Sequence, residues 1–316
     1  MAAIAVLESP IDPEQKSGRK HHPSDSLLRE LKRNLTAHSF LIGAVLAFAL
    51  FSWYPMVREF IMSFQKQKLG QSHWVGWHNF VQVWNDPSFG QAWWNTLEFT
   101  LLALLLGYVV PFFIAIVMNE FRHANGYMRV LVYLPVMLPP VASLVLFQYF
   151  YNPDYGLFNH ILSTLHLPTS EWLQSPRMSM IAVVVASTWM NMGSGTLIYL
   201  AALQGIPGEL YEAAEIDGAG ILRRIWHVTI PQTRMILSMM LMLQIVATMQ
   251  VFVEPFVLTN GGQGVDNSTT TIVYLVYQYA FPFGNTGAAS ALGLMLLIVL
   301  AAFALVYRRL MSRVQD

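Results

Sequence analysis

Apolar residues are gathered along this chain into six long runs, and the stretches between them hold most of its charged residues. A helix that crosses the hydrocarbon layer of a bilayer needs about 20 mostly apolar residues. By this measure we predict six membrane-spanning helices, at about 38–60, 95–118, 129–151, 178–203, 235–258 and 287–308. Prolines fall inside the second and third, at Pro111, Pro135, Pro139 and Pro140. We expect both helices to bend, because each proline removes a backbone hydrogen bond.

One polar stretch interrupts this pattern between the fourth and fifth runs. It reads PGELYEAAEIDGAGILRRIWHVTIP over 207–231, whereas residues 178–208 and 235–253 contain no charged residue. Pro207 suits the first turn of a helix, and Gly218 can end that helix in the left-handed conformation that glycine adopts without strain. We predict a helix-turn-helix loop over 205–232, its second helix running from Ala219 to about Thr229, with Pro231 interrupting the chain before the fifth span.

The composition places the chain among integral membrane proteins. Hydrophobic residues make up 55% and charged residues 11%, with a mean hydropathy of +0.45, whereas a soluble domain carries about 25% charged residues. The predicted fold class is therefore an all-α integral membrane protein. The 18 basic and 18 acidic residues cancel, so net charge gives no argument for a nucleic-acid partner. The absence of cysteine from the sequence excludes a disulfide framework, thiol catalysis and cysteine metal sites.

Lysine and arginine are unevenly divided between the two sides of such a protein. With the N-terminus in the cytoplasm, fourteen of the 18 fall on the cytoplasmic side, where these residues are usually enriched. We therefore predict that both termini are cytoplasmic. The predicted domains are a cytoplasmic tail over 1–37, a six-span domain over 38–308 and a second tail over 309–316. Within the first tail, leucines beside basic residues fit either a short helix on the membrane surface or a disordered basic leader.

Motif searches give no sign of an enzyme. The sequence has no G-x-x-x-x-G-K-[ST] phosphate loop, no H-E-x-x-H zinc pattern and no G-x-S-x-G serine pattern. We predict no catalytic residue, no metal site and no cofactor held by this chain. Among acidic residues, Glu98 and Glu254 come closest to the membrane interior, and we expect both at the external interface. Carriers driven by protons or sodium usually need carboxylates within the membrane, which counts against a secondary transporter.

The middle of the spans offers uncharged hydrogen-bonding groups instead. The candidates for a substrate pathway are Asn191, Tyr199, Gln244, Thr248 and Gln250. Such groups suit a neutral, hydroxyl-rich solute better than an ion, but they also bond neighbouring helices in membrane proteins. The sequence leaves both interpretations open.

The loop over 205–232 combines small and acidic residues in a way that fits contact with another protein. Its small residues allow a partner's backbone to approach closely, and its carboxylates can accept hydrogen bonds from arginine, lysine or amide groups. The residues that we predict to dock are Glu212, Ala213, Ala214, Asp217, Gly218 and Ala219. An ordinary amphipathic connector has a similar composition and is the alternative interpretation.

The same residues carry a family resemblance. Glu212-Ala213-Ala214, Asp217-Gly218-Ala219 and Ile230-Pro231 together resemble the "EAA" loop of the inner-membrane permease subunits of binding-protein-dependent ABC importers. The closest resemblance is to the sugar-uptake group that includes maltose-type and glycerol-phosphate-type permeases. Similar stretches cover the chain from about residue 38, at 95–100, at Arg129 with Pro135 and Pro139, at 199–214, and at 258–262 with Thr269 and Thr270. Two departures are Ile225-Trp226 in place of a common phenylalanine, and Gln263-Gly264 in place of the usual proline.

The resemblance implies a permease subunit whose loop inserts into a cleft on a cytoplasmic ATP-binding subunit. Two copies of that subunit would bind ATP and Mg²⁺, and their closure would rock the membrane helices from inward-facing to outward-facing. A second, homologous permease would complete the path, and an external solute-binding protein would deliver a sugar or sugar-like solute to loops near 64–94 and 259–286. The expected location is the cell inner membrane, with lipid as a further partner. A stand-alone channel or secondary carrier is the alternative, and a phosphate ester is the alternative to an uncharged solute.

Overall fold

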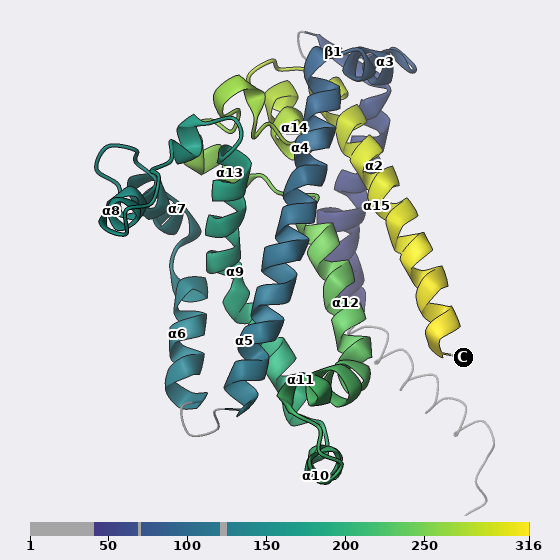
Figure 1. Ribbon diagram of the computed structural model, residues 1–316. Helices are drawn as coiled ribbons and strands as arrows, with labels where there is room; N and C mark the ends of the chain where they lie inside the picture. Colours follow the sequence, from purple (N-terminus) through teal and green to yellow (C-terminus); the bar gives the residue numbers. More distant parts are fainter. Residues whose placement is uncertain (1–40, 69–70, 121–124, 316) are drawn as a thin grey trace, which may run out of the picture. The chain divides into compact units, whose positions relative to one another are not determined.

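The structure is a computed structural model that describes residues 41–68, 71–120 and 125–315 (Figure 1). The chain separates into two compact units, one up to Arg58 and one from Glu59 onward. The described residues of the first unit belong to a helix that starts at Leu41 and contains a π-helical turn, η1 (Ala49–Trp53). The predicted tail over 1–37, the start of the first span and the predicted cytoplasmic Arg122 lie outside the described residues.

The second unit is helical except for one hairpin among its described residues. After α2 (Tyr54–Ser63), β1 (Gln65–Lys68) pairs antiparallel with β2 (Gln71–Trp74), and α3 (His78–Trp84) follows. The long helices are α4 (Pro87–Ala103) with η2 (Leu104–Tyr108) and α5 (Val109–Glu120), α6 (Asn125–Met137) with α7 (Pro140–Phe150), α9 (Ser179–Gln204), α12 (Ile230–Thr248) and α15 (Thr286–Gln315). The short helices are α8 (Leu157–Thr164), η4 (Trp172–Gln174), α10 (Gly208–Ile216), α11 (Ile221–Arg224), η5 (Ile225–Thr229), α13 (Val253–Leu258), η6 (Val265–Asn267) and α14 (Ile272–Ala280).

The predicted all-α membrane architecture is confirmed. Five helices of the described residues are long and apolar enough to cross a membrane, and a sixth crossing is added if the bent pair α6 and α7 counts as one span. That pair turns by 96° at its break. The break falls at Leu138 and Pro139, because Pro139 and Pro140 cannot donate backbone hydrogen bonds to α6. The bend predicted for the third span is therefore present.

Each π-helical turn in the described part of the chain stands just before a proline. Pro55 follows η1, Pro111 follows η2 and Pro231 follows η5, and in each case the residue four positions earlier lies inside the π-turn. A proline ring collides with that residue's carbonyl in a regular α-helix. The π-turn widens the helix there and lets it continue. The predicted interruption at Pro231 is therefore wrong, since Ile221–Thr248 forms one helix of 28 residues.

The predicted end of the fifth span, near residue 258, is also wrong. The helix stops at Thr248, and the separate α13 begins four residues beyond Met249, at Val253. A continuous helix would need an N–H at Pro255 to bond the carbonyl of Val251, and proline has none. The hydroxyl of Thr271 donates to that carbonyl instead, at 3.0 Å. The Thr271 hydroxyl thus takes the place of the backbone donor that Pro255 lacks.

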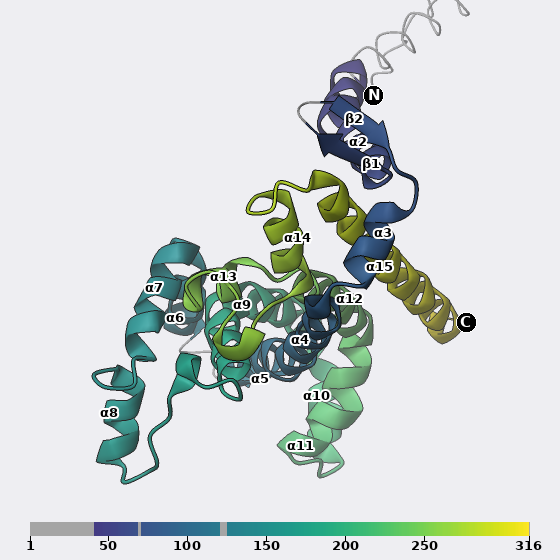
Figure 2. The same ribbon diagram turned by 90° about the horizontal axis from the view of Figure 1, so that it is seen from above.

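Helix α9 packs at the centre of the second unit. It contacts α4, α5, α6, α12 and α13, and Figure 2 shows these helices gathered around it while α8 projects away. The approach of α6 is close, because a Cβ on Gly193 would lie 2.5 Å from the carbonyl oxygen of Val132. Buried side chains from α4, α7, α9 and α13 form one continuous apolar cluster here. This packing fixes the side of α9 that remains free to line a cavity.

At the end of the helices opposite α10, α4 holds the segment before α14 in place. The side-chain amide of Asn95 donates to the carbonyls of Asn267 and Thr270, at 2.7 and 2.9 Å, and the Thr96 hydroxyl accepts from the N–H of Ile272 at 3.0 Å. Both side chains are buried. The segment needs such anchors, because six of its residues from 260 to 267 have a positive φ: Asn260, Gly261, Gly262, Gly264, Asp266 and Asn267. Two stretches that carry the family resemblance, 95–100 and 258–270, thus contact each other.

Asp86 and Tyr279 tie α14 to the start of α4 at the same end. The Asp86 carboxylate caps α4 by accepting from the N–H of Ser88 at 2.7 Å, and it also accepts from the Tyr279 hydroxyl. Burial raises the pKa of Tyr279, and the bond to Asp86 raises it further. The hydroxyl therefore stays protonated and continues to donate throughout the neutral range.

Replacing Asn95 by leucine should lower the thermal stability of the chain. The change keeps the side-chain size but removes the buried amide donor to the Thr270 carbonyl and one of three donors to the Asn267 carbonyl, at a cost of about 2 kcal/mol. Gln91→Leu is the matched control, because Gln91 bonds the same segment through the carbonyls of Asp266 and Asn267 but is exposed. Thermal unfolding in detergent should show a clear decrease in Tm for Asn95→Leu alone. Equal decreases for both variants would contradict the anchoring role.

Candidate functional site

A cavity of about 460 Å³ lies between α4, α9, α12 and the start of α13. Asn191, Tyr199, Gln244, Thr248 and Gln250, the five residues singled out from the sequence, all line it. Its remaining polar lining comes from Ser187, Thr188, Ser194 and Glu254. The structure therefore brings every predicted pathway residue to one place.

Helical periodicity explains this convergence. Ser187, Asn191, Ser194 and Ile198 recur every three or four residues along α9 and so share one face of that helix. Met240, Leu243, Gln244, Ala247 and Thr248 do the same along α12. At 1.5 Å per residue, the lining from Ser187 to Tyr199 extends about 18 Å along α9. The cavity is therefore elongated in the direction of the spans.

The hydrogen bonds of the lining residues mostly stay within their own helices. The Asn191 amide donates to the carbonyl of Ser187 at 2.9 Å, the Thr248 hydroxyl to that of Gln244 at 2.8 Å, and the Gln250 amide to that of Val246 at 2.8 Å. Gln244 and Tyr199 reach other helices, since the Gln244 amide donates to the Ala103 carbonyl of α4 at 3.5 Å and the Tyr199 hydroxyl bonds the Tyr108 hydroxyl of η2. Three of the five thus bond within their own helix, and two bond a neighbouring helix.

Tyr199 closes the end of the cavity nearest the α10 loop. It is almost completely buried, and its ring packs edge-on against Tyr108 and Phe112, with ring centroids 6.0 and 5.3 Å apart. Asn191, Ser194 and Gln250 are exposed at the surface of this chain. The cavity is therefore closed at its end nearest α10 and open along one side.

Glu254 is a lining residue that the sequence did not assign to the pathway. We expected it at the external interface, near the end of a longer fifth span, and the break after Thr248 brings it onto the cavity wall. The Ser187 hydroxyl donates to its carboxylate Oε1 at 3.0 Å. The signal that could have revealed this position is Pro255, because a proline so close to the expected helix end favours a new helix start.

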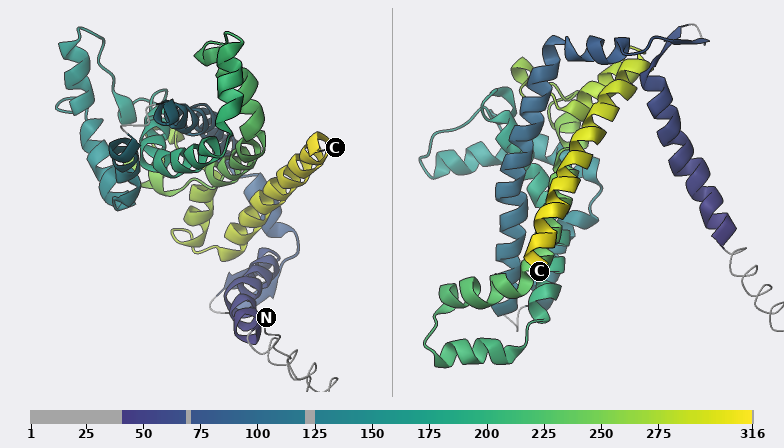
Figure 3. Two further views of the ribbon diagram at one scale, coloured as in Figure 1. Left: turned by 90° about the horizontal axis from the view of Figure 1, so that it is seen from below. Right: turned by 90° about the vertical axis from the view of Figure 1, so that its right-hand side faces the viewer.

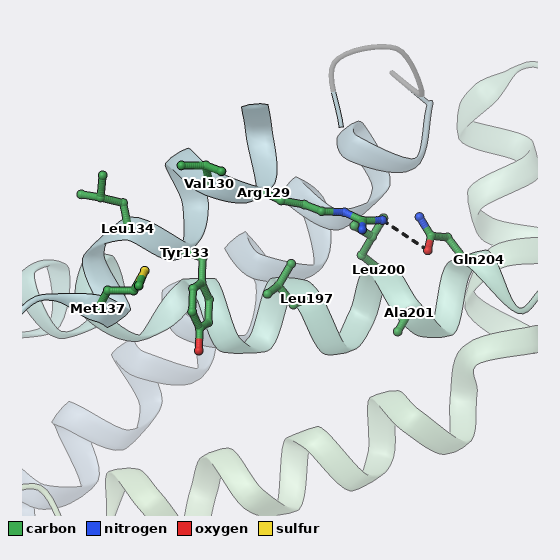
Figure 4. A pocket seen from close by; sticks show the side chains of 9 residues that line it. All are labelled: Arg129, Val130, Tyr133, Leu134, Met137, Leu197, Leu200, Ala201 and Gln204. Atoms are coloured by element: carbon green, nitrogen blue, oxygen red, sulfur yellow. Dashed lines mark hydrogen bonds between the residues drawn. The ribbon is translucent and has the colours of Figure 1, made fainter. Parts of the chain in front are cut away.

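A second hollow of about 510 Å³ lies between α6 and α9 and differs in character (Figure 4). Its walls are mostly apolar, from Val130, Leu134, Met137, Leu197, Leu200 and Ala201. Its polar end is formed by Arg129, whose guanidinium donates to the side-chain oxygen of Gln204 at 3.5 Å. The first cavity, by contrast, has amide, hydroxyl and carboxylate groups among its apolar lining residues, and these can bond a hydrophilic solute.

The loop after α9 consists of α10, a turn at Gly218 and α11, which begins at Ile221. The N–H groups of Gly218 and Ala219 donate to the carbonyls of Glu215 and Ala214, both at 2.9 Å, and Gly218 has a positive φ of 73°. This is the Schellman arrangement that glycine permits at a helix end. In Figure 3 (right), α11 runs back beside α10 and then continues into α12.

The residues predicted to dock lie mainly on the outside of this loop. Glu212, Ala213, Asp217 and Gly218 are exposed, whereas Ala214 and Ala219 are partly buried. Behind them, α10, the end of α5 and the end of α9 enclose a hollow of about 590 Å³, which Glu212 also lines. The structure thus leaves most of the predicted docking surface free for contact.

Arg224 holds the loop against the membrane helices. Its guanidinium pairs with Glu215 at the end of α10 and lies 3.9 Å from the carboxylate of Glu120 at the end of α5. The Arg224 side chain is only 13% exposed. Sequence reasoning did not single out this residue, because its two partners lie on different elements.

Residues 103–316 match the family model described as "Binding-protein-dependent transport system inner membrane component". The match covers the cavity lining on α9, α12 and α13 and the whole loop. The chain belongs to this family. As a permease of the inner membrane, it is a transport component with several membrane crossings, in agreement with the expectation that it is not an enzyme.

Curated relatives cover nearly the whole permease. The arabinooligosaccharides transport system permease protein AraP of Bacillus subtilis is 32% identical over 89% of this chain and 91% of its own length. The trehalose/maltose transport system permease protein MalF of Thermococcus litoralis is 32% identical over 84% of this chain and 89% of its own. Among solved structures, a bacterial ABC transporter that imports the acidic polysaccharide alginate has a chain with a TM-score of 0.80 and 24% identity, covering 92% of this permease and 100% of that chain. The sugar-uptake group named by the resemblance is thereby confirmed.

Proposed function

We propose that this permease forms, together with a second homologous permease, the membrane path of an ATP-driven importer for a sugar or sugar-like solute. The observation that carries the proposal is the elongated cavity lined by Asn191, Tyr199, Gln244, Thr248 and Gln250. Amide and hydroxyl groups can donate to and accept from the hydroxyls of a sugar. Relatives named for arabinooligosaccharides, trehalose and maltose support this class of solute.

The open side of the cavity supports a second permease as partner. Asn191, Ser194 and Gln250 are exposed along it, together with apolar neighbours such as Leu243 and Ile198. Asn191 and Gln250 each donate to a carbonyl of their own helix, but their amide oxygens would lack hydrogen-bond donors if they faced lipid, at a cost of several kcal/mol for each such group. A facing subunit would enclose the solute and supply those partners.

The loop around Gly218 supports contact with a cytoplasmic ATPase, of which two copies would serve the two permeases. Those ATPases would bind the ATP and Mg²⁺, and this chain would contribute Glu212, Ala213, Ala214, Asp217, Gly218 and Ala219 to the contact. Both termini would then be cytoplasmic, with the α14 end of the helices facing outward. An external solute-binding protein would deliver the solute there, to the segments near 64–94 and 259–286.

Reconstitution in liposomes tests the proposal. Uptake of radiolabelled maltose or an arabinooligosaccharide should require the second permease, the ATPase, the solute-binding protein and ATP together. A stand-alone channel or secondary carrier would instead let the purified chain transport without nucleotide. Transport by this chain alone would therefore overturn the proposal, and an ATPase mutant that binds but does not hydrolyse ATP is the control.

A further inference from the structure

The cavity has one ionisable acid in its lining. Of the residues that line it, only Glu254 carries a carboxylate, and none is a lysine, arginine or histidine. The side chain is partly buried, and the Ser187 hydroxyl holds its Oε1 at 3.0 Å. That bond holds the Glu254 carboxylate of α13 against Ser187 of α9. The second carboxylate oxygen stays available, since Ser187 contacts only Oε1.

A fixed carboxylate makes the electrostatic potential in the cavity negative. It attracts cations and repels anions, and the effect grows in surroundings less polar than water. It can also accept two or more hydrogen bonds from sugar hydroxyls, and bonds to an ionised acceptor are the stronger kind. Amide and hydroxyl groups elsewhere in the lining do not compensate for the negative charge.

We propose that Glu254 is a specificity-determining residue that makes this path selective for uncharged or cationic polyhydroxy solutes over anionic ones. The inference rests on the proposed function, because it assigns a charge preference to the same path. It separates the two solute classes left open by the sequence, since a phosphate ester or an acidic sugar would meet a like charge at Glu254. The fold alone does not set this preference, because the alginate transporter shares the fold and imports an acidic polysaccharide.

The natural absence of cysteine makes a direct test available, since any single cysteine introduced is the only thiol. Gln250→Cys places a reporter on the exposed part of the cavity wall. In membranes that contain the full chain, its reaction rate is measured with two methanethiosulfonate reagents of similar size, one cationic and one anionic. The cationic reagent should react faster, and Glu254→Gln should reduce the ratio of the two rates roughly fivefold or more.

Two controls separate charge from structure. Glu254→Asp keeps the charge and should keep the ratio well above that of Glu254→Gln. The second control is Ser163→Cys, on α8 and outside the cavity lining. Its ratio of reaction rates should be the same in the chain with Glu254 and in the Glu254→Gln variant. An unchanged ratio at Gln250→Cys in the Glu254→Gln variant would overturn the inference, as would an equal change at Ser163→Cys.

The ratio of the two reaction rates tests the role of Glu254 independently of the transport assay. Failure of the complete importer to take up any sugar would contradict the proposed function without altering the reagent ratio. An unchanged reagent ratio would leave transport of sugars in place and remove only the charge selection assigned to Glu254.

Discussion

Replacing Gly218 by arginine should abolish ATP-driven uptake while the membrane helices stay folded. The position has a φ of +73°, which costs an L-residue roughly 1–2 kcal/mol, and a long side chain would also stand on the proposed ATPase contact. Association with the ATPase, measured by co-purification, and stimulated ATP hydrolysis should both be lost. Normal stimulated hydrolysis in this variant would contradict the docking assignment.

A pair of alanine variants separates the two causes. A Cβ on Gly218 or on Gly220 would meet no atom within 4 Å, but only Gly218 has a positive φ. Gly218→Ala should therefore reduce uptake by roughly five- to tenfold through backbone strain of about 1 kcal/mol or more. Gly220→Ala should leave uptake nearly unchanged. Equal effects would indicate that the backbone conformation of the turn does not matter for coupling.

Replacing Arg224 by alanine should uncouple ATP hydrolysis from uptake. The change frees α10 from the end of α5, because Arg224 is the residue that contacts both Glu215 and Glu120. The loop could then still bind the ATPase without moving the membrane helices with it. We expect hydrolysis to continue while the number of solute molecules imported per ATP falls severalfold.

Arg223→Ala is the matched control for this prediction. It removes the same charge one residue earlier, from an exposed side chain. Surface ion pairs contribute no more than about 1 kcal/mol, and both carboxylates are well exposed, so Arg224→Ala should remain folded. Arg224→Lys should restore part of the coupling, since it keeps the charge but not the forked geometry. Unchanged import per ATP in Arg224→Ala would contradict the role.

The sequence predicted the features that depend on local pattern. Apolar run length located the spans, and turn chemistry located the left-handed Gly218. Helical spacing also brings the five predicted pathway residues to the wall of one cavity. These features share a physical cause, because each is determined by neighbours within a few residues of the chain.

Features set by contacts between distant segments could not be predicted. At the early end of the fifth span, Thr271, twenty residues away, bonds the Val251 carbonyl that Pro255 leaves without an N–H donor. Glu254 enters the cavity only as a result of that break. The pairing of Arg224 with Glu120 joins elements about a hundred residues apart. The sequence did not predict that a π-turn lets the helix continue past Pro231. The reason is different here, since a proline at that point is equally compatible with a helix start.

The uninterrupted helix from Ile221 to Thr248 has a kinetic consequence. Its first turns belong to the loop and its last turns carry Gln244 and Thr248, so one rigid element connects the proposed ATPase contact to the cavity wall. Fluorescent or spin labels at the two ends should therefore report a conformational change with a single shared rate. The π-turn η5 is the one place along this element where bending could introduce a delay.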